Sequence, residues 1–181
     1  MRILLHICCA PCSIYPTNYL RQKGLEIYGY SYNPNIHPEE EYIRRLNEQK
    51  KLIEQFPVQN KITFIEGKYE PEVFFKEVKG FENEPEGGNR CLKCFYLRLN
   101  KTAQKAQELK IPFFTTTLTI SPHKNAIAIN QIGNEITDEY QLHYLFSDFK
   151  KKNGFKRSIV LSEQYGLYRQ NYCGCVFSNN K

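Results

Sequence analysis

Segments with the pattern of strands alternate with segments with the pattern of helices along almost the whole sequence. Apolar or alternating runs bounded by turn residues predict strands at 2–7, 25–32, 61–66, 113–120 and 144–149. The segments between and after them predict helices at 13–23, 38–55, 72–78, 91–109, 122–132 and 158–165. This alternation is typical of an α/β fold with a mostly parallel sheet flanked by helices, and we expect one such domain across residues 1–181.

The first predicted strand leads directly into the sequence H-I-C-C-A-P-C, from His6 to Cys12. Parallel sheets bind ligands beyond the carboxyl ends of their strands, so these thiols fall where a ligand site is expected. A nucleotide-binding protein would usually place a glycine-rich phosphate loop there, but no glycine occurs between Met1 and Lys23. The site is therefore predicted to use thiols in place of phosphate binding. His6 is expected to pack in the core or to hydrogen-bond behind the site.

The cysteine content indicates a reducing compartment. Seven cysteines in 181 residues are too few for a disulfide scaffold, and their number is odd. The segment between Arg2 and Cys8 is too short for the apolar region of a signal peptide, and no run approaches the ~18 apolar residues of a membrane span. We therefore expect a cytoplasmic protein with reduced thiols. In a reducing compartment, clustered cysteines are more often metal ligands or redox groups than structural disulfides.

All seven cysteines fall into three clusters, which are Cys8-Cys9-x-x-Cys12, Cys91-x-x-Cys94 and Cys173-Gly174-Cys175. Structural cysteines would be scattered singly, so the clusters predict a shared site. The second cluster should open a helix, whose positive end would lower the thiol pKa and favour thiolate ligands. Four thiolates suit zinc or an iron–sulfur cluster. Because the domain can build a core without metal, a redox-active cluster is favoured over structural zinc.

The third cluster predicts a different role. Gly174 permits a tight turn that could bring the sulfurs of Cys173 and Cys175 together. A disulfide in so small a ring would be strained and easily reduced, which makes the pair a candidate electron carrier. Alternatively, the pair could bind a second metal ion with Cys12.

A basic stretch near the C-terminus suggests a nucleic-acid partner. The net charge of +6 is modest, but cations gather in one part of the sequence: Lys150, Lys151, Lys152, Lys156, Arg157 and Arg169. With Tyr165, Tyr168 and Tyr172 around Arg169, this composition suits phosphate contacts and base stacking. The alternative is a solvated basic face with the tyrosines in the core.

The sequence leaves the roles of one residue and one short segment undecided. Asp148 precedes the lysine run at a predicted strand end, where it could protonate a substrate, ligate a metal or cap a helix. Pro122, His123 and Lys124 follow the fourth predicted strand and are expected to start a helix. There they would either cap the helix or contact a phosphate.

Six segments together resemble the QueH family, the cobalamin-independent epoxyqueuosine reductases of tRNA queuosine biosynthesis. They are H-I-C-C-A-P-C-S (6–13), N-P-N-I-H-P (33–38), E-P-E-G-G-N-R-C-L-K-C-F-Y-L-R-L (84–99), T-T-L-T-I-S-P-H-K-N (116–125), D-F-K-K-K-N-G-F-K-R-S (148–158) and L-Y-R-Q-N-Y-C-G-C (167–175). They span nearly the whole chain, and no cysteine position departs from the family pattern.

The resemblance implies a fold related to the adenine-nucleotide hydrolase and PP-loop proteins. It implies a [4Fe–4S] cluster bound by Cys8, Cys9, Cys91 and Cys94 at the strand ends, and a redox-active pair in Cys173 and Cys175. An adjacent mononuclear iron could use leftover ligands such as Cys12.

The implied activity is reduction of the epoxide of epoxyqueuosine in a tRNA anticodon loop, with electrons from a separate donor. Two alternatives remain open from the residues alone. One is a zinc-stabilised tRNA-binding module, and the other is a thiol–disulfide oxidoreductase.

Overall fold

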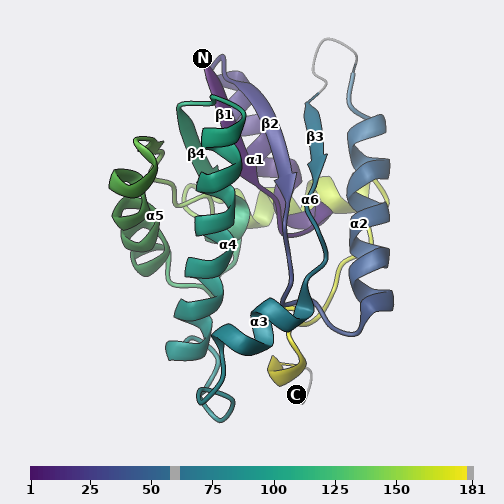
Figure 1. Ribbon diagram of the computed structural model, residues 1–181. Helices are drawn as coiled ribbons and strands as arrows, with labels where there is room; N and C mark the ends of the chain where they lie inside the picture. Colours follow the sequence, from purple (N-terminus) through teal and green to yellow (C-terminus); the bar gives the residue numbers. More distant parts are fainter. Residues whose placement is uncertain (58–61, 179–181) are drawn as a thin grey trace.

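A single parallel sheet organises the computed structural model, which describes residues 1–57 and 62–178 (Figure 1). The strands are β1 (Arg2–His6), β2 (Glu26–Ser31), β3 (Thr63–Glu66), β4 (Phe113–Thr116) and β5 (His143–Tyr144). Their order is β3-β2-β1-β4-β5, and every pairing is parallel. The predicted α/β class is therefore confirmed. Lys61, the first residue of the third predicted strand, lies outside the described residues.

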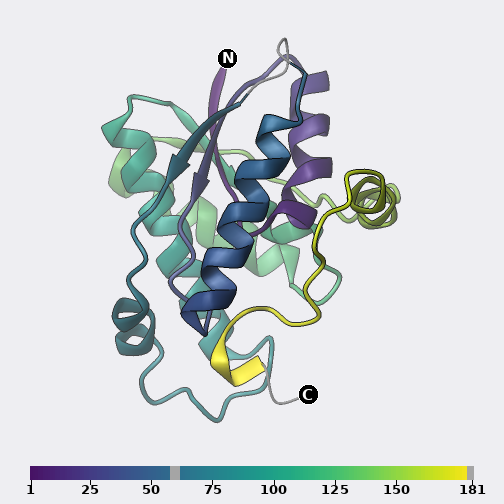
Figure 2. The ribbon, with the colours of Figure 1, turned by 90° about the vertical axis from the view of Figure 1, so that its right-hand side faces the viewer.

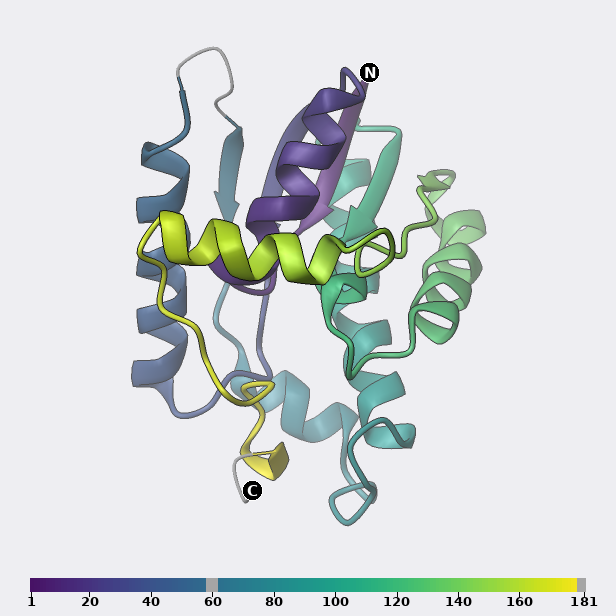
Figure 3. The same cartoon turned by 180° about the vertical axis from the view of Figure 1, so that it is seen from behind.

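Helices cover both faces of the sheet. They are α1 (Ala10–Gln22), α2 (Glu39–Glu54), α3 (Pro71–Glu77), α4 (Asn89–Glu108), α5 (Ala126–Tyr140) and α6 (Gly154–Gln164), with the short 3-10 helices η2 (Thr117–Ile120) and η3 (Val176–Ser178). Helices α4 and α5 lie on one face, and α1 lies on the other with α6 crossing it (Figure 3). Beyond α6, the chain runs beside α2 to the end of the sheet where the strands finish (Figure 2).

The central strand β1 is buried on both faces, which explains its nearly continuous apolar sequence. Its alternate residues Ile3 and Leu5 pack in a cluster with Tyr15 and Leu20 of α1. Leu4 points the other way and packs with α4 and α5. The strand is thereby fixed on both sides, and the residues that follow it leave the sheet at its centre.

The sheet contains a topological switch point at the end of β1. Strand β2 pairs with β1 on one side and β4 pairs on the other, so the chain connections diverge there. Open α/β sheets bind their ligands in the crevice at this place. Cys8 and Cys9 follow β1, and Thr117 follows β4, so these three residues border the crevice.

The sheet's fourth strand and the helix after it differ from the sequence prediction. Strand β4 ends at Thr116, not at residue 120, because the Thr116 side chain accepts a hydrogen bond from the Leu118 N–H and starts η2. The next helix begins at Ala126, where the Asn125 side chain caps two N–H groups, and it continues to Tyr140. The prediction of a helix start at Pro122 is therefore wrong, and residues 122–124 form a turn.

Three other boundaries also differ. Strand β5 covers only His143–Tyr144, so the prediction of a strand to residue 149 is wrong and Asp148 lies in the following turn. Helix α6 begins at Gly154, four residues earlier than expected. Helix α1 begins at Ala10, directly after the adjacent cysteines, so Cys12 lies in its first turn.

Candidate metal centre

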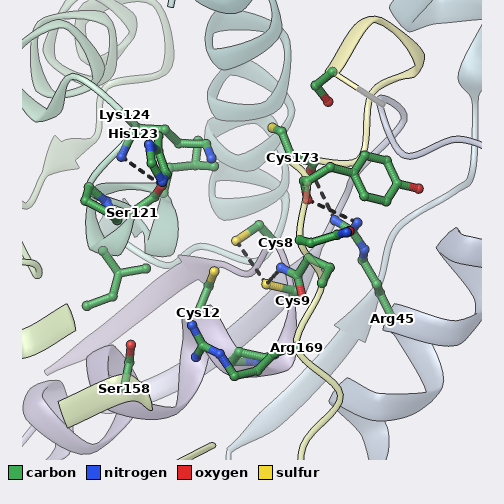
Figure 4. A pocket seen from close by; sticks show the side chains of 18 of the residues that line it. Cys8, Cys9, Cys12, Arg45, Ser121, His123, Lys124, Ser158, Arg169 and Cys173 are labelled. Atoms are coloured by element: carbon green, nitrogen blue, oxygen red, sulfur yellow. Dashed lines mark hydrogen bonds between the residues drawn. The ribbon is translucent and has the colours of Figure 1, made fainter. Parts of the chain in front are cut away.

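Three thiols face one another at the switch point. The Sγ atoms of Cys8, Cys9 and Cys12 all lie within 4.8 Å of one another. Cys8 follows β1, Cys9 is the N-cap of α1, and Cys12 is one turn into that helix, so the start of the helix folds the thiols together (Figure 4). Three converging sulfurs are a donor set that suits zinc or iron–sulfur chemistry. The cysteines can therefore hold a metal.

Cys8 is the thiol of this group that ionises first. Hydrogen bonds from Cys12 and Cys9 lower the pKa of Cys8 well below its ordinary value, helped by the Arg98 charge and a hydrogen bond from Thr117, against the opposing effect of burial. The same interactions with Cys8 and Cys9 raise the pKa of Cys12. A hydrogen bond from Cys12 lowers the pKa of Cys9, but Cys8 and burial together raise it to about 12. Of the three thiols, Cys8 therefore holds its proton least tightly.

Neighbouring side chains fix the orientation of two of these sulfurs. The Thr117 hydroxyl accepts a hydrogen bond from the Cys8 N–H at 3.2 Å and donates one to the Cys8 Sγ at 3.3 Å. The Gln170 carboxamide donates to the Cys9 Sγ at 2.8 Å. Residues behind metal ligands orient them in this way. The expected role of His6 is confirmed, since it is buried and hydrogen-bonds to Thr116 and to the Tyr32 carbonyl.

The predicted ligands Cys91 and Cys94 lie on the first two turns of α4. The Gly87 N–H donates to the Cys91 Sγ at 3.2 Å, and Cys94 is buried in a cluster that also contains Cys175. Across residues 1–57 and 62–178, the group of Cys8, Cys9 and Cys12 is the only one with three or more potential ligand atoms this close. Joint ligation by Cys8, Cys9, Cys91 and Cys94 stays a prediction.

The pKa values of the α4 thiols contradict one expectation from the sequence. The positive end of the helix was expected to lower them, but burial raises the pKa of Cys91 and raises that of Cys94 to about 12. The prediction is wrong for these thiols without metal because the loss of hydration outweighs the helix dipole.

Arg98 links the two groups of cysteines. It follows Cys94 by one turn of α4, and its Nη1 lies 4.0 Å from the Cys94 Sγ. Its Nη2 donates to the Asn33 Oδ1 at 2.5 Å, and the side chain lines the same pocket as Cys8 and Cys173. A buried cation therefore lies between the first cluster and the α4 pair.

The C-terminal cluster is held against α2. Arg45 donates to the Cys173 carbonyl at 3.1 Å and to the Tyr172 carbonyl at 3.4 Å, and the His37 N–H donates to the Gly174 carbonyl at 2.7 Å. Gly174 has φ +113, a backbone conformation that favours glycine. All seven cysteines are free thiols in the structure.

The two C-terminal thiols have different surroundings. Cys173 lines the pocket, whereas Cys175 is buried and packs with Phe74, Val78 and Cys94. The predicted redox role of Cys173 and Cys175 stays a prediction.

The thiols open into a pocket of about 350 Å³ with a cationic wall. Five basic residues line it, Arg45, Arg98, His123, Lys124 and Arg169, and Glu86 is its one acidic residue within the described chain. Burial lowers the pKa of Lys124, but the nearby charges of Cys173, Cys8 and Cys12 outweigh burial and raise it. The pocket is therefore suited to an anionic ligand that must approach the sulfurs.

The other predicted binding residues lie outside the lining of this pocket. Lys150 and Lys151 form ion pairs with Asp148 at 3.2 and 3.7 Å, and Arg157 is exposed on α6. Tyr168 donates to the Glu41 carboxylate, and the Arg44 guanidinium covers its ring at 3.4 Å. Asp148 does not cap a helix, because the N-cap of α6 is Asn153. Of the basic stretch from Lys150 to Arg169, only Arg169 lines the pocket, together with His123 and Lys124 from the turn after η2.

Four site residues were missed in the sequence, namely Arg45, Arg98, Thr117 and Gln170. The available signal was helical spacing, since Arg98 follows Cys94 by four positions and so shares its helix face. Arg45 and Gln170 carry no such signal, because they reach the site from distant parts of the chain.

Within the described residues, no helix combines the length and apolar character needed to cross a membrane.

Comparison with known proteins identifies the family. The model of the family described as "Epoxyqueuosine reductase QueH" matches residues 3–181. A protein of that name from Streptococcus pyogenes serotype M1 is 48% identical over 178 residues, covering 97% of this chain and 69% of its own. A relative of the same name from Staphylococcus epidermidis is 45% identical, and the match covers 99% of this chain and 77% of the relative. Another from Thermotoga maritima is 35% identical, and the match covers 97% of this chain and 89% of the relative. A chain with these matches and with free thiols grouped at the switch point of a parallel sheet belongs to the QueH family of epoxyqueuosine reductases.

Proposed function

We propose that this protein reduces the epoxide of epoxyqueuosine in tRNA to the alkene of queuosine. Its relatives are named for this reaction. The structural observation that supports it most is the convergence of Cys8, Cys9 and Cys12 at the floor of a pocket with a cationic wall. Such a pocket brings a polyanionic substrate to a group of sulfurs.

The reaction requires a source of electrons. Converting an epoxide to an alkene consumes two electrons and two protons, and the oxygen leaves as water. The chain contains no other redox-active side chains as concentrated as its thiols, and an external donor must replace the electrons after each turnover.

We propose that Cys8, Cys9, Cys91 and Cys94 hold a [4Fe–4S] cluster. Bound there, the cluster would supply electrons one at a time. Two features support this fit: the sulfur donor set, and the buried Arg98, whose Nε lacks a hydrogen-bond partner and which faces Cys8 and Cys94. Cys12 and Cys173, which line the same pocket, could hold an adjacent mononuclear iron.

The C-terminal thiols offer another route for electrons. Oxidation of Cys173 and Cys175 to a disulfide would release two electrons and two protons, which is the quantity that one turnover consumes. In the structure both thiols are free, and Cys175 is buried in a separate cluster. The C-terminal segment would therefore have to rearrange before the disulfide could form. A disulfide and a second iron are alternative uses of Cys173.

Other residues bind and orient. Thr117 and Gln170 hold the sulfurs of Cys8 and Cys9 in place. We propose that Lys124 and Arg169 contact phosphates beside the modified base. Lys150, Lys151 and Arg157 would extend these contacts along the anticodon arm.

The test is anaerobic purification and reconstitution, followed by iron and sulfide analysis. Turnover is then assayed on tRNA carrying epoxyqueuosine, with a strong chemical reductant and mass spectrometry of the released nucleosides. We expect iron and sulfide in the wild type and in Lys23→Ala, a surface control at the far end of α1, but not in Cys8→Ser. A colourless zinc protein would favour the tRNA-binding module, and a metal-free protein with redox activity would favour a thiol–disulfide oxidoreductase.

A further inference from the structure

We propose that Arg98 is the counter-cation of the metal centre, balancing the negative charge of its thiolates and raising its reduction potential. This positioning role rests on the proposed function, because it assumes a metal held by thiolates. It assigns a purpose to an arginine that is buried, whereas arginines are mostly exposed.

The burial of Arg98 requires an explanation. Its side chain is 2% exposed, and it is the largest fully buried side chain of the described residues. Its one short hydrogen bond goes to the neutral Asn33 carboxamide, and its Nε has no partner. Among the described residues, no carboxylate forms an ion pair with it. A guanidinium buried in this way is strongly unfavourable unless an anion lies close by.

Two other buried arginines show how the chain satisfies such charges elsewhere. Arg45 pairs with the Glu41 carboxylate at 2.6 Å. Arg90 donates to the main-chain carbonyls of Glu82 and Glu84 in the loop before α4. Arg98 has neither arrangement, so its environment is complete only when another group supplies negative charge.

The groups that can supply this charge are cysteines. Arg98 faces Cys94, Cys8 and Cys173, which come from all three cysteine clusters. Each becomes an anion when it ligates a metal as thiolate. Four thiolates around an iron–sulfur cluster, or three around a divalent ion, leave a net negative charge. The guanidinium therefore fits the metal-bound site better than the site with neutral thiols.

A fixed positive charge also acts on electron transfer. Reduction adds negative charge to the centre, and a nearby cation stabilises the reduced form through a Coulomb interaction that burial strengthens. Removing the cation should therefore make the reduction potential more negative and should weaken the binding of metal by the thiolates.

The test compares charge removal with charge retention. Arg98→Met and Arg98→Gln remove the charge, and Arg98→Lys retains it. Lys101→Met removes a charge one turn further along α4, over the ring of Tyr32. Folding of every variant is checked by circular dichroism, and Arg98→Gln, which keeps a donor for Asn33, replaces Arg98→Met if that variant unfolds.

The first measurement is Co²⁺ binding to the metal-free protein, followed by thiolate-to-cobalt absorption. We expect affinity to fall about tenfold or more in Arg98→Met and Arg98→Gln, equivalent to about 1.4 kcal/mol, and to change little in Lys101→Met and Arg98→Lys. The second is the midpoint potential of the reconstituted centre, which should become more negative only where the charge is lost. Unchanged affinity and potential in the neutral variants would overturn the proposal. Equal effects in Arg98→Lys, which keeps the charge, would also overturn it, since they would assign Arg98 a purely structural role.

The two proposals fail separately. If the wild type forms no iron–sulfur centre, the proposed function is wrong, but the Co²⁺ series still tests Arg98 against thiolates of this site. If the centre forms and reduces the epoxide while the neutral variants bind Co²⁺ normally at an unchanged potential, only the role of Arg98 is wrong.

Discussion

The carboxamide of Gln170 donates a hydrogen bond of 2.8 Å to the Sγ of Cys9, although the two residues lie 161 positions apart. The other end of the same carboxamide, Oε1, is buried with no partner. The hydrogen bond to Cys9 therefore determines the orientation of the Gln170 carboxamide. Through it, the segment after α6 is tied to the first turn of α1.

Replacing Gln170 by leucine should weaken metal binding without unfolding the protein. The side chain keeps its approximate volume, but Cys9 loses the donor that orients its sulfur. Loss of such a partner behind a ligand typically lowers metal affinity 10–100-fold, and we expect about tenfold here. Co²⁺ titration measures it. Gln164→Leu, on the exposed end of α6, is the control and should bind like the wild type.

Serine at Cys91 or Cys94 should abolish binding of the iron–sulfur cluster while leaving the fold largely intact. Both thiols sit on the first turns of α4, and the core beneath them is built from residues of the sheet and helices. Iron per chain after reconstitution and the melting temperature are the measurements. If both variants retain iron near the wild-type level, Cys91 and Cys94 are not ligands of the cluster.

Serine at Cys173 or Cys175 should leave the cluster and tRNA binding in place but should lower turnover by orders of magnitude. The proposed cluster ligands lie elsewhere, and the proposed phosphate contacts come from lysine and arginine side chains. Each variant is reconstituted, shown to contain four irons, and assayed with a strong reductant. Survival of turnover in both variants would exclude a role as carrier or ligand. Loss of the cluster would instead assign one of these cysteines to it.

Alanine at Gly174 should destabilise the protein more than alanine at Gly166. Both glycines have positive φ, but an ideal Cβ on Gly174 would lie 2.9 Å from the Arg45 Nη1 and 3.0 Å from the Ile36 Cγ1, whereas nothing lies within 4 Å of one on Gly166. Backbone strain costs on the order of 1–3 kcal/mol at either site, and the clash adds to it only at Gly174. Urea unfolding measures both. Equal losses would mean that Arg45 shifts without cost.

Alanine at Lys150, Lys151 and Arg157 together should weaken tRNA binding and flatten its dependence on salt. Each lost phosphate contact lowers the slope of log affinity against log salt by about 0.7–0.9. The control replaces Lys23, Lys51 and Lys105, which lie near the ends of α1, α2 and α4 remote from the pocket. Reduction of the free nucleoside, where measurable, should be unaffected. If the slope of log affinity against log salt does not change, these three residues belong to a solvated basic face that does not bind tRNA.

The sequence predicted the elements whose cause is local. The apolar run of β1 depends on a few consecutive residues, and the strand that it predicts is confirmed. The end of β4 could not be predicted from alternation alone. The T-T-T-L-T-I pattern continues, but the Thr116 side chain competes for the Leu118 N–H and turns the chain.

The site was predicted in its chemistry more than in its geometry. The clustering of cysteines identified the thiols, and the strand end before Cys8 gave their place in the fold. Which of them lie within 4.8 Å depends on the path of α1 and α4 around the sheet, and that path is a tertiary property. The burial of Arg98 could not be anticipated, because arginine is normally exposed and only the fold reveals what surrounds it.

The contact between Cys9 and Gln170 also sets an order of events during synthesis. A ribosome that has made Cys9 must add 161 residues before it makes Gln170. At about 5–20 residues per second, roughly ten to thirty seconds separate the two. During that interval the first thiols have left the ribosome without the segment that closes over them. For that time the N-terminal thiols therefore exist without the hydrogen bond that orients the Cys9 sulfur in the finished protein.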